Sequence, residues 1–325
     1  MIKFAVIGRN FIVDWFLEAA SEFPELFFRG VYSRAKETAA EYAALKGAER
    51  IYTSINELCK DDELDMVYIA SPNICHEEQA IALLNAKKHV LCEKPAAISA
   101  EGLSRMLETA EKNGRVFMEA MVPLHMPAFE EVRRLLPELG KIRHAEFSFC
   151  QYSSRYDRFK NNIMTNTFDP ALGNGSLMDL GIYCVHFLLA LFGMPQKIHT
   201  AAEFIPGSID ASGAIAAAYP DMTASLVYSK VCDSLNLSQI MGEDGCLLID
   251  KVSRPKKLTL KKRGGDAKVI DLTPTRHEMA YEIQNFIRQI NGEKMPQFNE
   301  ISKLAMNFCD IARAEAGIDF KKERH

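Results

Sequence analysis

The chain has 325 residues, of which 48% are hydrophobic and 25% are charged, and its formal net charge is -4. This length exceeds what one core usually holds, so we expect two domains. The small negative charge excludes a general attraction to nucleic acid or to an anionic membrane surface. The eight cysteines include no Cys-x-x-Cys pair, so neither a redox motif nor a metal site is indicated.

The start of the chain and its apolar runs bear on location. Met1-Ile2-Lys3-Phe4 leads directly into an expected strand, which argues against a signal peptide. We also expect no apolar run to be long enough to span a bilayer. Together with cysteines that resemble small core residues, these features predict a cytoplasmic protein.

Short apolar runs alternate with helix-spaced segments over the first 120 residues. Strands are expected at residues 3–7, 27–32, 51–52, 66–70, 90–92 and 116–120, and helices at residues 11–23, 35–45, 76–86 and 100–113. Strands that alternate with helices are typical of a parallel, doubly wound α/β sheet. We therefore predict a dinucleotide-binding Rossmann domain over residues 1–120.

The turn after the first strand is where such a sheet binds cofactor phosphates. It reads Gly8-Arg9-Asn10-Phe11-Ile12-Val13, so only the first glycine of G-x-G-x-x-G is present. Asn10 is able to adopt the left-handed conformation that a glycine would supply, and Val13 is expected to keep the helix slightly further from the strand. A Rossmann-like domain that binds no nucleotide is the alternative. The predicted phosphate contacts are Gly8, Arg9, Asn10, Phe11 and Ile12.

The second strand is followed by Ser33-Arg34, at a place where an NAD site usually has an acidic residue. A hydroxyl and a guanidinium suit a 2′-phosphate, so we predict NADP in preference to NAD. The alternative is that Arg34 merely begins a solvated helix.

The loop after the fourth strand reads Ala70-Ser71-Pro72-Asn73 and continues to His76. Pro72 ends the strand, and Asn73 offers donors and acceptors to a ribose or an amide. His76 either touches the ligand or takes a capping or surface role, which is the more common outcome at a helix start.

The fifth strand ends at Glu93-Lys94-Pro95. Pro95 stops strand pairing because proline has no amide proton, and it favours an extended Lys94. Ligands of α/β sheets bind at this carboxyl edge, so Lys94 can place a fixed positive charge beside a reacting oxygen. The alternative is a loop lysine that happens to follow a strand.

The pattern changes after about residue 120. A helix is expected at residues 127–136, a long strand at 140–152 and a loop at 153–167, and loops often carry recognition residues. Residues 177–189 form a mostly buried helix in which Asp179 and Tyr183 share a face. Polar groups inside a buried helix need partners, and the alternative is a helix-start aspartate with an amphipathic tyrosine.

Further alternating runs predict an open, largely antiparallel sheet, at residues 199–204, 214–219, 223–229, 238–242, 246–249 and 257–260. Turns such as Pro206-Gly207 separate them. The basic cluster Lys256, Lys257, Lys261, Lys262 and Arg263 is interpreted as a solvated strand edge and not as a nucleic-acid patch. Helices at 277–289 and 302–316 close the chain. Residues 121–325 should thus form an α+β domain for substrate binding and oligomerisation, with the last helix packed back on the first domain.

Two motifs and their order carry a resemblance. Glu93-Lys94-Pro95, followed by Gly173-Asn174-Gly175-Ser176-Leu177-Met178-Asp179-Leu180-Gly181-Ile182-Tyr183, resembles the glucose–fructose oxidoreductase/inositol dehydrogenase/MocA (Gfo/Idh/MocA) family over nearly the whole chain. Many members have histidine where this chain has Tyr183. The tyrosine is similar to the branch with glucose–fructose oxidoreductase, dimeric dihydrodiol dehydrogenase and NADP-dependent xylose dehydrogenases. The chain departs from the family pattern at Asn10 and Val13, and at Leu124 and Met126.

The resemblance implies reversible hydride transfer between a nicotinamide cofactor, NADP or else NAD, and a carbinol carbon of a sugar or polyol. Tyr183 would be the acid/base, Lys94 would supply charge, and Asp179 would orient the substrate hydroxyl or Lys94. Further substrate contacts are expected from Tyr152, Arg155 and Asn166, and further cofactor contacts from Ala70, Ser71, Pro72, Asn73, His76 and Glu93.

No metal is implied by the resemblance. Family members pair through the open sheet of the second domain, which implies a homodimer or homotetramer. Two other functions stay open at this point. One is a non-catalytic NAD(P)-binding sensor, and the other is a reductase of a non-sugar carbonyl.

Overall fold

The computed structural model describes residues 1–205 and 209–320, and the predicted turn at Pro206-Gly207 lies outside them. By its internal contacts the chain divides into two units. The first comprises Met1–Met121 and Arg276–Glu300. The second comprises Val122–Thr275 and the chain from Ile301 onward.

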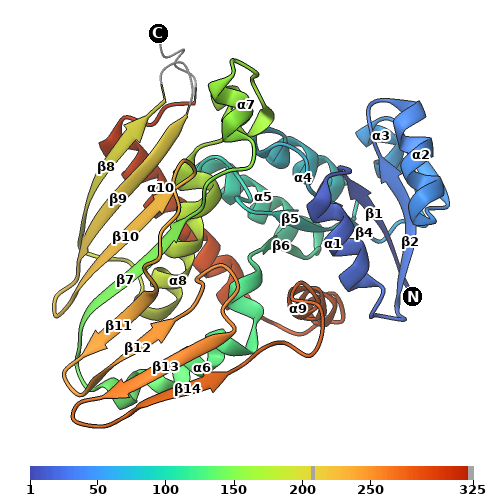
Figure 1. The fold of residues 1–325 in the computed structure, drawn as a ribbon. Coiled ribbons are helices and arrows are strands. Elements are labelled where there is room, and N and C mark those ends of the chain that lie inside the picture. Colours follow the sequence, from blue (N-terminus) through green and yellow to red (C-terminus); the bar gives the residue numbers. More distant parts are fainter. Residues whose placement is uncertain (206–208, 321–325) are drawn as a thin grey trace. The chain divides into compact units, whose positions relative to one another are not determined.

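Six parallel strands form the sheet of the first unit, in the order β3-β2-β1-β4-β5-β6 (Figure 1). They are β1 (Ile2–Ile7), β2 (Leu26–Tyr32), β3 (Arg50–Tyr52), β4 (Met66–Ile69), β5 (His89–Glu93) and β6 (Phe117–Ala120). The predicted Rossmann sheet is therefore confirmed. In this strand order the ligand crevice lies at the carboxyl edge, where the order reverses between β1 and β4.

Helices cover both faces of this sheet. They are α1 (Phe11–Ala20), α2 (Lys36–Lys46), α3 (Ile55–Lys60), α4 (His76–Asn85), α5 (Ala100–Asn113) and, from the C-terminal part of the chain, α9 (Ala280–Ile290). Ser99 caps α5, because its hydroxyl accepts from the amide of Gly102 at 3.1 Å. The short helix α3 was not predicted. One part of the core lies between α1 and the sheet, where the ring of Phe16 stacks on that of Tyr68 at 3.8 Å.

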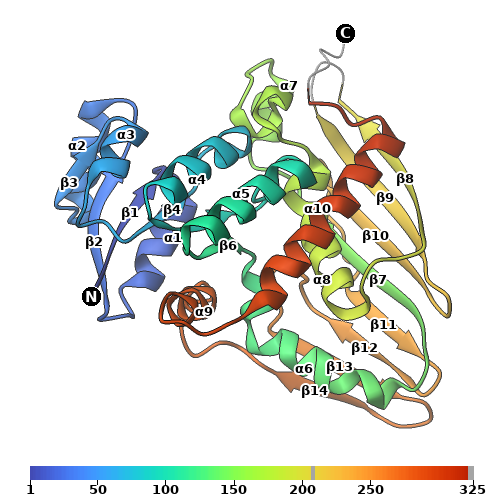
Figure 2. The ribbon, with the colours of Figure 1, turned by 180° about the vertical axis from the view of Figure 1, so that it is seen from behind.

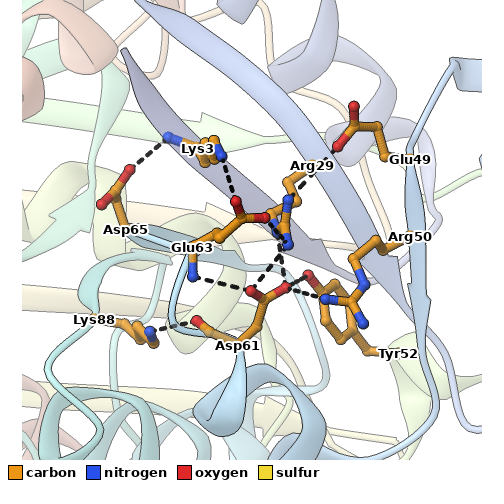
Figure 3. A network of polar contacts seen from close by, with 9 residues as sticks. All are labelled: Lys3, Arg29, Glu49, Arg50, Tyr52, Asp61, Glu63, Asp65 and Lys88. Carbon is orange, nitrogen blue, oxygen red and sulfur yellow. Dashed lines mark hydrogen bonds and ion pairs between the residues drawn. The ribbon is translucent and has the colours of Figure 1, made fainter.

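A buried network of charges ties β2 and β3 to the segment that precedes β4 (Figure 3). Asp61 accepts from Arg29 Nε at 2.7 Å, from Tyr52 Oη at 2.6 Å and from Arg50 Nη1 at 3.0 Å. Burial raises the pKa of Asp61, but the bonds from Arg29 and Tyr52 outweigh it and hold that pKa well below the usual range of an aspartate. The network lies toward the amino ends of β1 and β4, away from the edge that carries Gly8.

The second unit contains an eight-stranded sheet in the order β14-β13-β12-β11-β7-β10-β9-β8 (Figure 1). Only β7 and β10 pair in parallel among these described strands, so the predicted open, largely antiparallel sheet is confirmed. The strands are β7 (Ile142–Cys150), β8 (Lys197–Phe204), β9 (Asp210–Ala218), β10 (Thr223–Ser229), β11 (Ser238–Gly242), β12 (Gly245–Ile249), β13 (Lys257–Lys262) and β14 (Ala267–Asp271).

The basic cluster lies differently from the prediction. Because β14 pairs with β13, the lysines of β13 are not on the edge strand. They are exposed, as expected, and their charges are met locally, for example by Lys262 pairing with Glu138 at 3.0 Å. Arg263 donates from Nε to the carbonyl oxygen of Glu243 at 2.9 Å. The cluster is therefore an exposed face one strand in from the edge.

Helices cover one face of the eight-stranded sheet, and in the described residues no helix covers the other (Figures 1 and 2). They are α6 (Pro127–Leu135), α8 (Ile182–Phe192) and α10 (Pro296–Ala316), with the core between them and the sheet, where Phe187 contacts Phe129 and Phe147. The predicted loop at 153–167 contains the short helix α7 (Tyr156–Lys160). Short 3₁₀ turns are η1 (Asn73–Cys75), η2 (Val122–His125), η3 (Leu136–Leu139), η4 (Asn166–Phe168) and η5 (Pro170–Leu172).

One helical stretch, Pro170–Phe192, has the length and composition of a membrane span, with a mean hydropathy of 1.7 in its most apolar window. The prediction that no apolar run reaches such a length is wrong by this measure. Within the protein, however, 72% of that window is buried. A core helix has the same composition, so this stretch is weak support for a membrane segment.

Candidate functional site

The first strand-to-helix turn of the first unit depends on Gly8. Its backbone φ is +115°, and a Cβ there would lie 2.7 Å from the carbonyl oxygen of Ala70 at the end of β4. No residue with a side chain fits this turn without movement of the backbone. Helix α1 begins at Phe11, so its N-terminal amides and the positive end of its dipole lie at the carboxyl edge of the sheet, as an anion site requires.

The prediction for Asn10 is wrong. Asn10 is extended, with φ −86° and ψ 175°, and not left-handed. Its side chain caps α1 by accepting from the amides of Ile12 at 3.2 Å and Val13 at 3.3 Å, and an extended backbone is what an N-cap residue needs. Val13 is fully buried, and one of its methyl groups would lie 3.4 Å from a Cβ at Gly8, which is ordinary van der Waals contact.

Cations and hydroxyls gather beyond the end of β2. Arg9 and Arg34 are exposed, and Arg9 donates to the carbonyl oxygen of Thr38 at 3.4 Å. The hydroxyls of Ser33 and Thr38 lie 3.5 Å apart. Two guanidinium groups, two hydroxyls and a glycine turn with no room for a Cβ fit a dinucleotide that carries a 2′-phosphate. Phe11 is 57% exposed at the start of α1 and Ile12 is half-buried.

His76 has neither a capping nor a surface role. It is buried, with Nε2 2.9 Å from the carbonyl oxygen of Ser71 and Nδ1 2.9 Å from that of Pro95. Burial lowers the pKa of His76 below its ordinary value and outweighs the effect of these two carbonyls, so at neutral pH the ring donates to one of them. The imidazole thereby joins the loop after β4 to the turn after β5. In the loop after β4, Ser71 also donates its hydroxyl to Gln79 at 2.7 Å.

Lys94 follows directly on β5, at the carboxyl edge, and is half-buried. The Lys94–Pro95 peptide bond is cis. The neighbouring Glu93 accepts from the hydroxyl of the fully buried Tyr68, and the next turn is held by the amide of Ala96, which donates to Glu119 at 2.8 Å. Lys94 therefore stands on a turn fixed from several sides.

In the second unit, Asp179 lies in a π-helix, Leu177–Gly181, that runs directly into α8 with Tyr183 in its first turn. Both side chains are half-buried. The ring of Tyr183 packs edge-to-face on Phe149 of β7 at 5.5 Å. π-helical turns inside helices are rare and are frequent at functional sites. The predicted buried helix is present, with this π-turn in place of a regular start.

Two glycines of this motif, Gly175 before the π-helix and Gly181 at its end, lie where a side chain would not fit. The buried carboxylate of Asp210 accepts from the amide of Leu177 at 2.7 Å, so β9 caps the helix start. A Cβ at Gly175 would lie 2.0 Å from Asp210 Oδ1, and a Cβ at Gly181 would lie 2.9 Å from the ring of Tyr228. The backbone at these two glycines therefore lies so close to the sheet that no larger residue fits there.

Asp179 has a partner that the sequence did not reveal. Lys230, directly after β10, places its Nζ 2.7 Å from Asp179 Oδ2. Only 3% of the Lys230 side chain is exposed, against 37% for Asp179. The predicted need of Asp179 for a partner is thus met within the second unit.

The three further residues predicted to contact a substrate form hydrogen bonds with residues that lie nearby in the chain. Tyr152 donates to Asp157 at 2.6 Å and accepts from Lys160 at 2.6 Å. Arg155 donates to the hydroxyl of Thr167 at 2.6 Å. The backbone carbonyl oxygen of Asn166 accepts a hydrogen bond from the side-chain amide of Asn174. Their role toward a substrate stays a prediction.

Sequence reasoning missed Lys230, Asp210 and the bridging role of His76. Lys230 stands alone after an alternating strand, and Asp210 begins a strand, so neither residue belongs to a motif. Among residues 1–205 and 209–320, no group of three or more histidine, cysteine or acidic side chains is arranged to hold a metal ion.

Two family models match the chain. Residues 2–121 match the model described as oxidoreductase family, NAD-binding Rossmann fold, and residues 129–248 match the GFO/IDH/MocA C-terminal domain. Among curated proteins, scyllo-inositol 2-dehydrogenase (NADP(+)) IolU of Bacillus subtilis is 37% identical over 327 residues, which cover 100% of both chains. Trans-1,2-dihydrobenzene-1,2-diol dehydrogenase of Oryctolagus cuniculus is 27% identical, with 91% of this chain and 92% of that protein covered.

The fold also matches solved structures. The structure of KijD10, a 3-ketoreductase from Actinomadura kijaniata, in complex with NADP and TDP-benzene, has a TM-score of 0.86 and 23% identity, with 97% of each chain covered. At this identity the match shows the shared fold.

Proposed function

Because the chain belongs to the Gfo/Idh/MocA family of oxidoreductases, we propose that it moves a hydride between NADP and a carbinol carbon of a sugar or polyol, with Tyr183 as the acid/base and Lys94 supplying positive charge. The observation that carries the proposal is the place of Lys94 at the carboxyl end of β5, on a turn braced by His76. That edge is where doubly wound sheets bind their ligands.

The choice of NADP rests on the groups beyond β2. Arg9, Ser33 and Arg34 supply positive charge and a hydroxyl where an acidic residue would otherwise hold the ribose of NAD. The names of IolU and of the KijD10 complex both include NADP, which supports the same choice. We therefore expect NADPH to bind more tightly than NADH.

When bound, the cofactor supplies or accepts the hydride, so the chain has to move the proton of the substrate hydroxyl. We assign this proton to Tyr183. A tyrosine ordinarily has a pKa of about 10, and a nearby ammonium favours its phenolate form. Lys94 would provide that ammonium and stabilise negative charge that develops on the substrate oxygen. Asp179 would accept a hydrogen bond from a substrate hydroxyl and so fix its orientation.

The sugar or polyol class comes from the relatives. IolU is named for scyllo-inositol, and the rabbit relative for a dihydrodiol, which is not a sugar. Both named compounds carry hydroxyl groups on neighbouring carbons. A non-catalytic sensor would have no use for an acid/base tyrosine or for a lysine at the carboxyl edge, so the enzyme is the preferred interpretation.

The test is a titration of NADPH and NADH by fluorescence, followed by a turnover screen with inositols, aldoses and dihydrodiols. Lys94→Ala and Tyr183→Phe should each lower turnover by at least about a hundredfold, because stabilisation of developing charge by Lys94 and general acid–base catalysis by Tyr183 each contribute that much. The matched controls Lys112→Ala, at the exposed end of α5, and Tyr281→Phe, on α9, should retain activity. If both site variants keep full turnover, the mechanism is wrong. NADPH binding without any turnover would favour the sensor.

We further propose a homodimer or homotetramer formed through the helix-free face of the eight-stranded sheet. This face carries the partly exposed Val227, and a hollow beside it is lined by Glu146, Leu235, Asn236, Leu237, Gln239 and Leu248. Apolar residues gathered on a sheet face are typical of an interface. Light scattering should give a multiple of 36.5 kDa, and Val227→Glu should shift the mass toward a monomer.

A cytoplasmic location is proposed on the eight free cysteines, because a reducing compartment keeps thiols unpaired.

A further inference from the structure

The ion pair of Lys230 and Asp179 is the feature from which a further role follows. Lys230 Nζ lies 2.7 Å from Asp179 Oδ2, a separation at which a charged hydrogen bond is strong. The two residues are 51 positions apart in the chain and both belong to the second unit. The pair joins the sheet, at the end of β10, to the π-helix that carries Asp179.

The two partners differ in exposure. The Lys230 side chain is 3% exposed and the Asp179 side chain is 37% exposed, so the ammonium lies behind the carboxylate as seen from solvent. A buried ammonium needs an anion beside it, because an unpaired buried charge is strongly unfavourable. An incoming molecule therefore meets the carboxylate, while the ammonium can act on that molecule only through Asp179.

The position of the ammonium is fixed by its surroundings. The backbone of Lys230 extends the sheet, since its amide donates to Ala211 at 2.9 Å and its carbonyl accepts from the amide of Ser153 at 2.8 Å. Its Nζ lies 3.5 Å from the carbonyl oxygen of Thr167 and 5.7 Å from the ring centroid of Phe168, which is fully buried. An aromatic ring and a carbonyl both favour a cation at this place. Lys230 is thus a rigid support and not a mobile surface lysine.

We propose that Lys230 is a positioning residue of the reaction. It holds the Asp179 carboxylate in one orientation, so that the carboxylate is already placed to accept a hydrogen bond from a substrate hydroxyl. This inference rests on the proposed function, in which Asp179 orients the substrate. It adds a residue that no motif contains and that does not touch the substrate itself.

The experiment compares four variants of the full-length protein: Lys230→Met, Lys230→Arg, Asp179→Asn and the double variant Asp179→Asn/Lys230→Met. Initial rates are measured with NADP and the best polyol from the turnover screen, and NADPH affinity is measured by fluorescence. Lys230→Met should lower kcat/KM for the polyol by about tenfold or more, while NADPH affinity stays within about twofold. Lys230→Arg, which keeps the charge, should recover part of the loss. A merely structural lysine would not give this pattern.

The double variant provides the decisive comparison. If Lys230 acts only through Asp179, adding Lys230→Met to Asp179→Asn should lower kcat/KM no further. If Lys230→Met alone does not fold, Lys230→Arg takes its place in this comparison, alone and combined with Asp179→Asn. The matched control is Lys141→Met, which removes a lysine from an exposed pair with Asp221 at 2.9 Å in the same unit and should leave the rates unchanged.

The outcomes separate the two proposals. Absence of polyol turnover in the unmodified protein overturns the proposed function and this inference with it. Turnover that falls in Asp179→Asn but not in Lys230→Met overturns the inference alone. The inference is also overturned if Lys230→Met lowers kcat/KM by the same factor whether residue 179 is aspartate or asparagine. Lys230 would then act by another route.

Discussion

Replacing Asp61 with asparagine should destabilise the first unit without affecting its ligand edge. The Asp61 side chain is 4% exposed and that of its partner Arg29 is 7% exposed (Figure 3). Removing one partner of a buried ion pair costs about 3–5 kcal/mol. Arg29 keeps Glu63 at 2.5 Å and Glu49 at 3.6 Å as further partners, so we expect the low end of that range. For a unit of this size, this corresponds to a fall in Tm of roughly 6–12 °C.

The assay is thermal unfolding followed by circular dichroism at pH 7. The matched control is Glu63→Gln, because the Glu63 side chain is 59% exposed and an exposed ion pair contributes little. NADPH affinity should not change in either variant, since Gly8 and the cations beyond β2 lie at the other edge of the sheet. A Tm for Asp61→Asn within about 2 °C of the unmodified protein, or equal to that of Glu63→Gln, would refute the reasoning.

The same network predicts a pH dependence. The pKa of Asp61 is lower in the folded protein than in the unfolded chain, where an aspartate titrates near 3.9. Its contribution is therefore fully present above that unfolded value and is lost as the pH falls below it toward the folded value. The difference in Tm between the unmodified protein and Asp61→Asn should accordingly shrink from pH 6 to pH 3. A difference that stays constant over this range would contradict the assignment.

The remaining predictions concern the site. Gly8→Ala should weaken NADPH binding by at least about tenfold and cost roughly 2 kcal/mol, because φ +115° and the contact with Ala70 both oppose a side chain; fluorescence titration and thermal unfolding check it. Gly175→Ala should abolish most polyol turnover but spare NADPH binding, because a Cβ displaces the buried Asp210 carboxylate at the start of the π-helix; normal turnover would count against the cap. His76→Leu should lower kcat and destabilise the protein by about 1–3 kcal/mol, since it leaves a buried carbonyl without its donor; unchanged rates and Tm would show that the bridge is dispensable.

The parallel sheet could be predicted from the sequence because its signals are local. Each strand is a short apolar run, and caps such as Ser99 mark helix starts within three residues. Elements without such signals were missed. Strand β14 is mostly exposed along its length, so it shows no alternation of apolar and polar residues, and its presence removed β13 from the sheet edge. Helix α7 has five residues and depends on the packing of Tyr156 against Phe168.

The candidate site was predictable only in part. Lys94, Asp179 and Tyr183 lie within motifs, so their residue types and spacing singled them out. Asn10 was assigned the conformation of the glycine it replaces, whereas its side chain instead made it an N-cap. His76 and Lys230 act through contacts with residues distant in sequence, such as Pro95 and Asp179, and no spacing rule encodes those contacts.

The place of β7 has a consequence for how the second unit acquires its structure. β7 lies between β10 and β11, and a bond between the side chains of His144 and Thr223 joins positions 79 residues apart. The meanders β8-β9-β10 and β11-β12-β13-β14 connect neighbours in sequence and can form early, whereas β7 has to close a long loop before it contributes. Until β7 is inserted, two strand edges are open to pairing with other chains. Renaturation of this protein should therefore be slowest, and most prone to aggregation at high concentration, at the step that completes the middle of the sheet.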